Sequence, residues 1–118
     1  MKRLILAVTL CLVMLLPLVA LAQTAISSGI LATSANIYRG AGILTGVLIL
    51  TDGSNAATVT VYDHAADAAG TVLFKATMLG ASYFGGGTWE YPVQFTNGIY
   101  VSISGTGATA IIYYATGR

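Results

Sequence analysis

After residue 22 the hydrophobic side chains recur at every second position in several separate windows, which is the period of a β-strand. In the clearest window, residues 89–95, Trp89, Tyr91, Val93 and Phe95 alternate with Glu90, Pro92 and Gln94. Pro92 has no amide hydrogen to donate, so this strand is predicted to lie at a sheet edge or to contain a bulge. Asn97-Gly98 follows it and is a strong hairpin signal that leads into a strand at residues 99–104.

Residues 42–51 are apolar on both faces, with Leu44, Leu48 and Leu50 opposite Ile43, Val47 and Ile49. This pattern predicts a strand that is buried on both sides, or one whose second face meets a partner chain. The other predicted strands are residues 57–63, 71–78 and 108–115, with weaker candidates at 26–31 and 35–38. Residues 79–88, which contain Gly85-Gly86-Gly87, are predicted to be the longest irregular and most mobile stretch.

Seven or eight short strands separated by turn signals favour an all-β fold, namely an antiparallel β-sandwich or jelly-roll-like domain. The turns include Asp52-Gly53-Ser54-Asn55 and Gly105-Thr106-Gly107. The chain has 118 residues, so residues 23–118 are predicted to form a single domain.

The first 22 residues have the three parts of a secretory signal peptide. Lys2 and Arg3 supply the positive start, an apolar helical run follows, and small residues precede a predicted cleavage site between Ala22 and Gln23. The alternative is a retained membrane anchor, which would be the only contact of the chain with a membrane. Both alternatives predict an exported protein in the periplasm, on the cell surface or outside the cell.

Charge is scarce in residues 23–118, which contain three basic and four acidic side chains and so have a net charge of −1. Without a basic face, binding to nucleic acid is not expected. The one cysteine, Cys11, lies in the leader, which excludes a disulfide, a zinc–cysteine site and a thiol nucleophile within residues 23–118. A surface with so little charge favours a homo-oligomer or packing against other structural proteins.

Asp63, His64 and Asp67 form the only cluster of ionisable residues. Carboxylates and an imidazole can bind calcium or a transition metal, but this spacing matches no standard metal-binding loop. The favoured interpretation is a solvated turn in which Asp63 caps backbone amides after its strand. We therefore predict no metal and no cofactor.

Catalysis is not predicted either. His64 is the only histidine, and no Gly-x-Ser-x-Gly elbow is present to expose a nucleophilic serine. Nothing in the sequence places two carboxylates across a cleft, as glycoside hydrolysis requires. No residue is assigned a catalytic role.

Aromatic residues cluster around the three consecutive glycines. Tyr83, Phe84 and Trp89 would form a sugar-stacking surface if their rings were exposed. The alternation of Trp89 with polar neighbours favours instead a place for its ring in the core.

Several strand-and-turn segments carry a resemblance to a known group of proteins: residues 42–47, 57–63, 69–74, 95–101 and 111–114. Together they resemble a family of small β-sandwich proteins that are frequent in tailed-phage and prophage genomes. The resemblance implies a non-catalytic, virion-associated role, such as head decoration or a spike or fibre module, and it assigns no functional residues. The leader departs from this pattern and implies a surface protein, or a virion protein assembled at a membrane.

Two hypotheses follow. In the first, the protein is a structural β-sandwich that acts by self-association or by packing against a partner. In the second, it is an exported monomeric module that binds a ligand such as a glycan.

Overall fold

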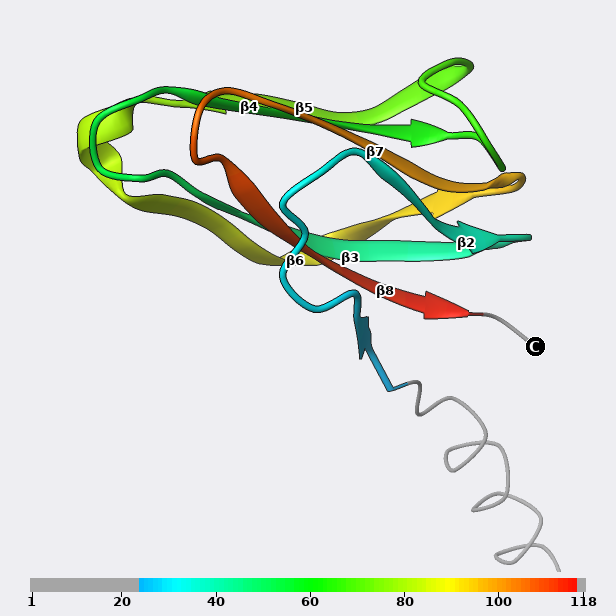
Figure 1. Cartoon of the computed structure of the whole chain (residues 1–118). Helices are drawn as coiled ribbons and strands as arrows, with labels where there is room; N and C mark the ends of the chain where they lie inside the picture. The colour runs from blue at the N-terminus through cyan, green and yellow to red at the C-terminus, as the bar shows by residue number, and fades with distance from the viewer. Residues whose placement is uncertain (1–23, 117–118) are drawn as a thin grey trace, which may run out of the picture.

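The computed structural model describes residues 24–116, so the predicted leader and the cleavage site between Ala22 and Gln23 lie outside the described part. Eight strands follow one another (Figure 1): β1 (Ile26–Ser27), β2 (Ala35–Arg39), β3 (Gly42–Leu50), β4 (Ala57–Asp63), β5 (Thr71–Met78), β6 (Phe84–Phe95), β7 (Gly98–Ser104) and β8 (Thr109–Thr116). One 3₁₀ turn, η1 (Gly80–Ser82), precedes β6. Among the described residues, no helix is long and apolar enough to cross a membrane.

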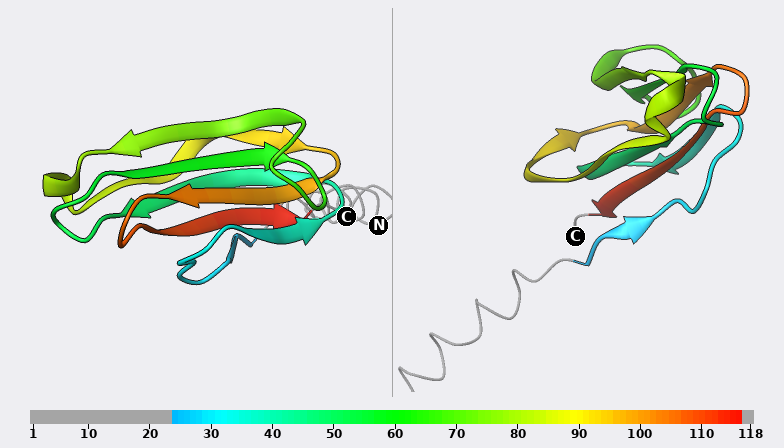
Figure 2. Two further views of the ribbon diagram at one scale, coloured as in Figure 1. Left: turned by 45° about the horizontal axis from the view of Figure 1, so that its top comes forward. Right: turned by 90° about the vertical axis from the view of Figure 1, so that its left-hand side faces the viewer.

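The strands form two four-stranded antiparallel sheets, which lie one above the other in Figure 2. Sheet A has the order β1-β8-β3-β6, and sheet B has the order β2-β7-β4-β5. The all-β, antiparallel prediction is confirmed. In chain order the first strand pairs with the last, the second with the seventh, the third with the sixth and the fourth with the fifth.

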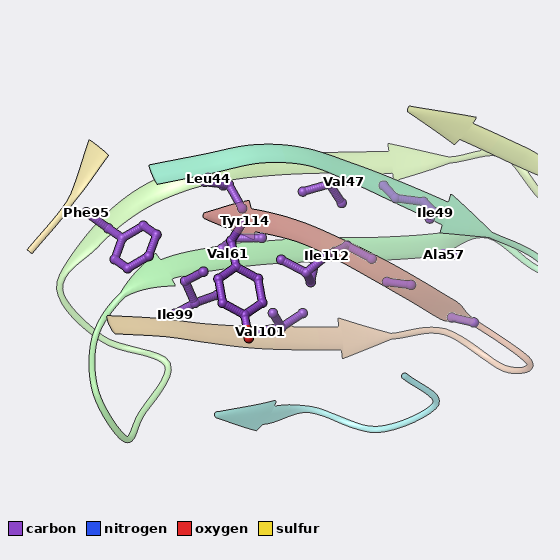
Figure 3. Close-up of a cluster of buried hydrophobic side chains, with 13 residues drawn as sticks. Leu44, Val47, Ile49, Ala57, Val61, Phe95, Ile99, Val101, Ile112 and Tyr114 are labelled. Atoms are coloured by element: carbon purple, nitrogen blue, oxygen red, sulfur yellow. The ribbon is translucent and has the colours of Figure 1, made fainter. Parts of the chain in front are cut away.

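The hydrophobic core lies between the two sheets. Alternate residues of each inner strand point inward, because successive side chains in a strand face opposite sides. Figure 3 shows these side chains gathered between the strands; the fully buried ones include Leu44, Val47, Ile49, Val59, Val61, Ile99, Val101 and Ile112. At one end Tyr38 packs against Phe95 and Tyr114, with ring centroids 6.1 and 5.7 Å away.

A bulge in β3 overturns the predicted division of that strand into two faces. Pairing with β8 shifts by one residue at Thr45, so the alternation restarts there. As a result Leu44, Val47 and Ile49 all point into the core, although the sequence pattern placed Leu44 on the opposite face from the other two. Periodicity alone could not detect the inserted residue.

Pro92 lies where its chemistry predicts. Strand β6 is an edge of sheet A, and its pairing with β3 is interrupted so that residues 89–92 stand opposite Thr45. Both predicted features, the edge position and the bulge, are therefore present.

The predicted irregular stretch at residues 79–88 is wrong for its second half. Gly85, Gly86 and Gly87 belong to β6 and pair with Ile49, Leu48 and Val47 of β3. A Cβ atom on Gly86 would overlap the carbonyl oxygen of Val47, so this close approach requires glycine. Glycines have no side chains and thus show no hydrophobic period, which hides such a strand from sequence patterns.

Asn97-Gly98 is a turn, but the predicted hairpin is wrong. The strands it joins, β6 and β7, belong to different sheets, so the turn crosses from sheet A to sheet B. Gly105-Thr106-Gly107 crosses back in the same way, between β7 and β8. Only β4 and β5 are consecutive strands paired within one sheet.

Candidate functional site

The carboxylate of Asp63, at the end of β4, binds the turn between β6 and β7. The amide of Asn97 donates to Oδ1 at 2.7 Å, the amide of Thr96 lies 3.1 and 3.0 Å from the two oxygens, and the amide of Gly98 donates to Oδ1 at 3.3 Å. The Thr96 hydroxyl also donates to Oδ2 at 3.2 Å. One carboxylate of sheet B thus fixes the crossing between the two sheets.

This corrects the predicted role of Asp63. We expected the side chain to cap amides of its own turn, whereas it caps amides that lie 33 to 35 residues further along the chain. Only the folded structure brings those amides to the end of β4, so no local sequence pattern contains the contact.

The hydrogen bonds change the acidity of Asp63. Burial of the carboxylate by itself would raise its pKa, but the amides of Asn97, Thr96 and Gly98 outweigh that effect and hold the pKa below the ordinary value. The pKa of Asp52 is also lowered, first by the amide of Asn55 and then by its side chain and the amide of Ser54. Both carboxylates therefore favour the folded state when ionised.

We expect Asp63→Asn to lower the free energy of unfolding at neutral pH by about 1–3 kcal/mol, because several donors lose a charged acceptor. Since the folded protein binds fewer protons than the unfolded chain in acid, stability rises with pH there and is lost as the pH falls through the folded pKa. The difference between wild type and Asp63→Asn should therefore shrink in acid. Urea unfolding at a series of pH values measures it.

Asp67→Asn is the matched control, because Asp67 is exposed in the same loop. It should leave stability at neutral pH almost unchanged, because the Asp67 side chain is exposed. Equal stability of Asp63→Asn and wild type at neutral pH would contradict the role assigned to the Asp63 carboxylate.

His64 and Asp67, the other two predicted metal candidates, lie in the loop between β4 and β5. The Nδ1 atom of His64 accepts hydrogen bonds from the amides of Ala66 and Asp67 at 3.1 and 2.9 Å. Asp63 and His64 are both engaged with backbone amides, and the described residues contain no group of three or more potential metal ligands.

The three aromatic candidates separate into two environments. Trp89 packs against the core, and its ring centroid lies 5.3 Å from that of Phe74 on β5. Tyr83 and Phe84 are 64% and 67% exposed, and Leu79 next to them in the β5–β6 connection is 71% exposed. We call Leu79, Tyr83 and Phe84 the apolar tip.

Tyr83 holds an unusual backbone conformation, with φ 56° and ψ −55°, and is the only described residue other than glycine with a positive φ. Its carbonyl accepts a hydrogen bond from the Thr51 amide at 2.7 Å, which fixes this strained position. Its ring packs over Gly53, where a Cβ atom would lie 2.7 Å from the ring. The exposed ring is thus anchored at its base.

The outer faces of the two sheets differ in chemistry. On sheet B, β4, β5 and β7 place mostly hydroxyl groups and one lysine outward, with Val72 near one end; the residues that share this face by register are Thr58, Thr60, Tyr62, Lys75, Thr77, Tyr100, Ser102 and Ser104. The hydroxyls of Thr58 and Thr77 are 2.8 Å apart. A solvated sheet has such a polar outer face.

The outer face of sheet A is mostly apolar instead, with Thr88, Gln94 and Thr109 as its polar residues by register. Its apolar residues by register and alternation are Ile43, Leu48, Leu50, Phe84, Ile111 and Tyr113, and we call this set the A face. All except Phe84 are half-buried, and Phe84 is exposed. Three of these residues, Ile43, Leu48 and Leu50, lie on β3. For this strand the sequence predicted either burial on both sides or a second face that meets a partner chain.

Sequence reasoning missed the contribution of β8 to the A face. Ile111 and Tyr113 point outward while Ile112 and Tyr114 point into the core. The signal was present, since residues 110–115 are apolar at every position, as residues 46–50 are.

Comparison with models of protein families, with characterised proteins and with solved structures finds no match.

Proposed function

We propose that this protein is an exported, non-catalytic structural protein that acts by self-association or by packing against other structural proteins. The strand pairing supports a jelly roll. Strand β1 pairs with β8, β2 with β7, β3 with β6 and β4 with β5, which is the pairing of one long hairpin wrapped into two sheets. Jelly rolls commonly serve as building blocks of larger assemblies, including viral capsids.

The A face is the observation that carries the proposal. A sheet face that stays in water is normally polar, as the outer face of sheet B is. An aliphatic and aromatic face on an exported domain favours an interaction surface. The Asp63 carboxylate is engaged by the amides of the turn between β6 and β7, and the His64 imidazole by amides of its own loop, so both have structural contacts that agree with a non-catalytic role.

The resemblance to small phage and prophage β-sandwich proteins agrees with an assembling role. A virion protein assembled at a membrane and a cell-surface protein of the host both fit a leader followed by a β domain. In each setting the protein would work beside many copies of itself or of a structural partner.

The test is the molar mass of the protein recovered after export with its own leader. Light scattering at rising concentration should give a mass that increases above that of one chain, because the uncharged A faces pair. A mass of one chain at the highest soluble concentration, with no structural partner co-purifying, would overturn the proposal.

The alternative function is that of an exported monomeric glycan-binding module. One observation favours it: Tyr83 and Phe84 are consecutive residues, and both side chains are exposed. Trp89 weighs against it, because a sugar platform built from all three aromatic candidates would need the Trp89 ring free of the core. A monomer that binds sugars on a glycan array, and loses binding on Tyr83→Ala, would establish this function instead.

A further inference from the structure

The A face lies on the central strands of sheet A. In β3, Leu48 is flanked by the fully buried Val47 and Ile49, so its side chain points away from the core. Its cross-strand partners are Ile111 on β8 and Gly86 on β6. In the described part of the chain the two sheets are the only layers, and Figure 2 shows no described segment over this side of sheet A.

The edges of the sheets are less suited to binding another copy by strand addition. The free edge of β5 carries Lys75 at its centre, β6 carries Pro92 within its bulge, and β2 ends in Arg39. Lysine, proline and bulges on edge strands oppose pairing with a further strand. Strand β8 contains no charged residue, but it lies between β1 and β3 and is therefore not a free edge.

Charge narrows the choice of partner for the A face. Neither β3 nor β8 contains a charged residue, and Glu90 in the β6 bulge is the one charged side chain of sheet A. A partner that buries this face must therefore be uncharged over the same area, because an unpaired charge there would be costly to desolvate. The A face of a second copy meets that requirement.

The shape of the A face also favours a second copy as the partner. Leu48 and Ile111 stand side by side as a ridge over β3 and β8, whereas Gly86 next to them is exposed and has no side chain. Rotation about a two-fold axis would place Leu48 and Ile111 of one copy over Gly86 of the other. Such self-complementarity is what an isologous interface requires.

The area of the A face sets the strength of the pairing. Nine residues of β3 span about 30 Å, and three strands about 4.8 Å apart cover about 15 Å, which gives a flat footprint of about 450 Å². Two copies would thus cover about 900 Å² of flat sheet, and side-chain relief would raise the buried area to about 1,000 Å², near the lower limit of specific interfaces. This size favours an association that depends on concentration.

From these observations we propose that the A face binds the A face of a second copy of this chain, sheet against sheet, with the ridge of Leu48 and Ile111 at its centre. This inference rests on the proposed function and adds the surface through which the protein assembles.

The experiment compares Leu48→Glu with Ser102→Glu in the exported protein by sedimentation velocity over a concentration series. Both positions are half-buried on central strands, but Leu48 belongs to the A face and Ser102 to the outer face of sheet B. Leu48→Glu should weaken association at least about a hundredfold, because each interface would bury two unpaired, like charges. Ser102→Glu should associate as the wild type does.

The outcomes separate the inference from the proposed function. If the wild type associates and Leu48→Glu associates equally well, the A face is not the contact surface. The proposed function in assembly would then remain. Wild type that never associates would refute both. Should Leu48→Glu fail to fold, methyl NMR spectra of the wild type give the answer. The Leu48 and Ile111 signals should shift with concentration, while the signals of Val72, which is exposed on the outer face of sheet B, should not. The reverse would contradict the inference.

Discussion

Ile112→Ala is expected to lower the free energy of unfolding by about 3–5 kcal/mol. Ile112 lies on β8, is fully buried between the sheets and is among the largest of the fully buried side chains. Removing three carbons there loses the burial of apolar surface and leaves a cavity, because β8 is paired on both sides at this residue and cannot collapse into it. Denaturant unfolding in a dilute sample measures the change.

Ile111→Ala is the matched control for this substitution. Ile111 is the preceding residue of the same strand, has the same side chain and is only half-buried on the A face. Its truncation should cost about 1 kcal/mol in the monomer, since less surface returns to water. A larger loss for Ile111→Ala than for Ile112→Ala would show that β8 faces the other way.

Gly86→Ala is expected to destabilise the protein by about 3–5 kcal/mol, through backbone strain together with overpacking. Gly86 has φ +103°, a conformation that residues with a side chain rarely adopt, and an added Cβ would overlap the carbonyl oxygen of Val47 on β3. Because that oxygen belongs to a central strand, relief would require β6 to move away from β3. Thermal and denaturant unfolding both report the loss.

Gly87→Ala separates the two causes. Gly87 also has a positive φ, +138°, but a Cβ there meets no atom within 4 Å. Its substitution should cost only the backbone strain, about 1–2 kcal/mol. If both variants lost the same stability, the close approach of β6 to β3 at Gly86 would have no energetic role.

The strands were the predictable part of the fold. Residues 57–63 and 98–104 alternate regularly, and their inward side chains, among them Val59, Val61 and Val101, form much of the core contributed by sheet B. Pro92 predicted an edge strand or a bulge, because its missing amide hydrogen restricts where a proline fits in a sheet. Local chemistry of this kind is visible in a single sequence.

The departures share a different origin, since each depends on contacts between distant residues. The bulge at Thr45 reverses the faces of half a strand without any signal in the pattern. The Asn97-Gly98 turn crosses between sheets because its amides bind Asp63, which comes from another strand. The candidate site shows the same division. The apolar pattern of β3 predicted either burial on both sides or a second face that meets a partner chain, whereas only the fold shows that Trp89 packs on Phe74.

The proposed pairing of A faces would give a physical reason for the low charge of residues 23–118. Charges at the centre of a sheet that a second copy covers would carry a large desolvation cost. The outer face of sheet B carries the lysine and most of the outward hydroxyl groups. The two sheets are thus suited to different surroundings.

The most direct measurement is an isotope-filtered NMR experiment on a mixture of labelled and unlabelled exported protein, in which only contacts between two copies give cross-peaks. We expect intermolecular peaks that link the methyl groups of Leu48 and Ile111 in one copy to β3 and β8 of the other. A concentrated sample with no intermolecular peaks, or with peaks confined to sheet B, would contradict the account.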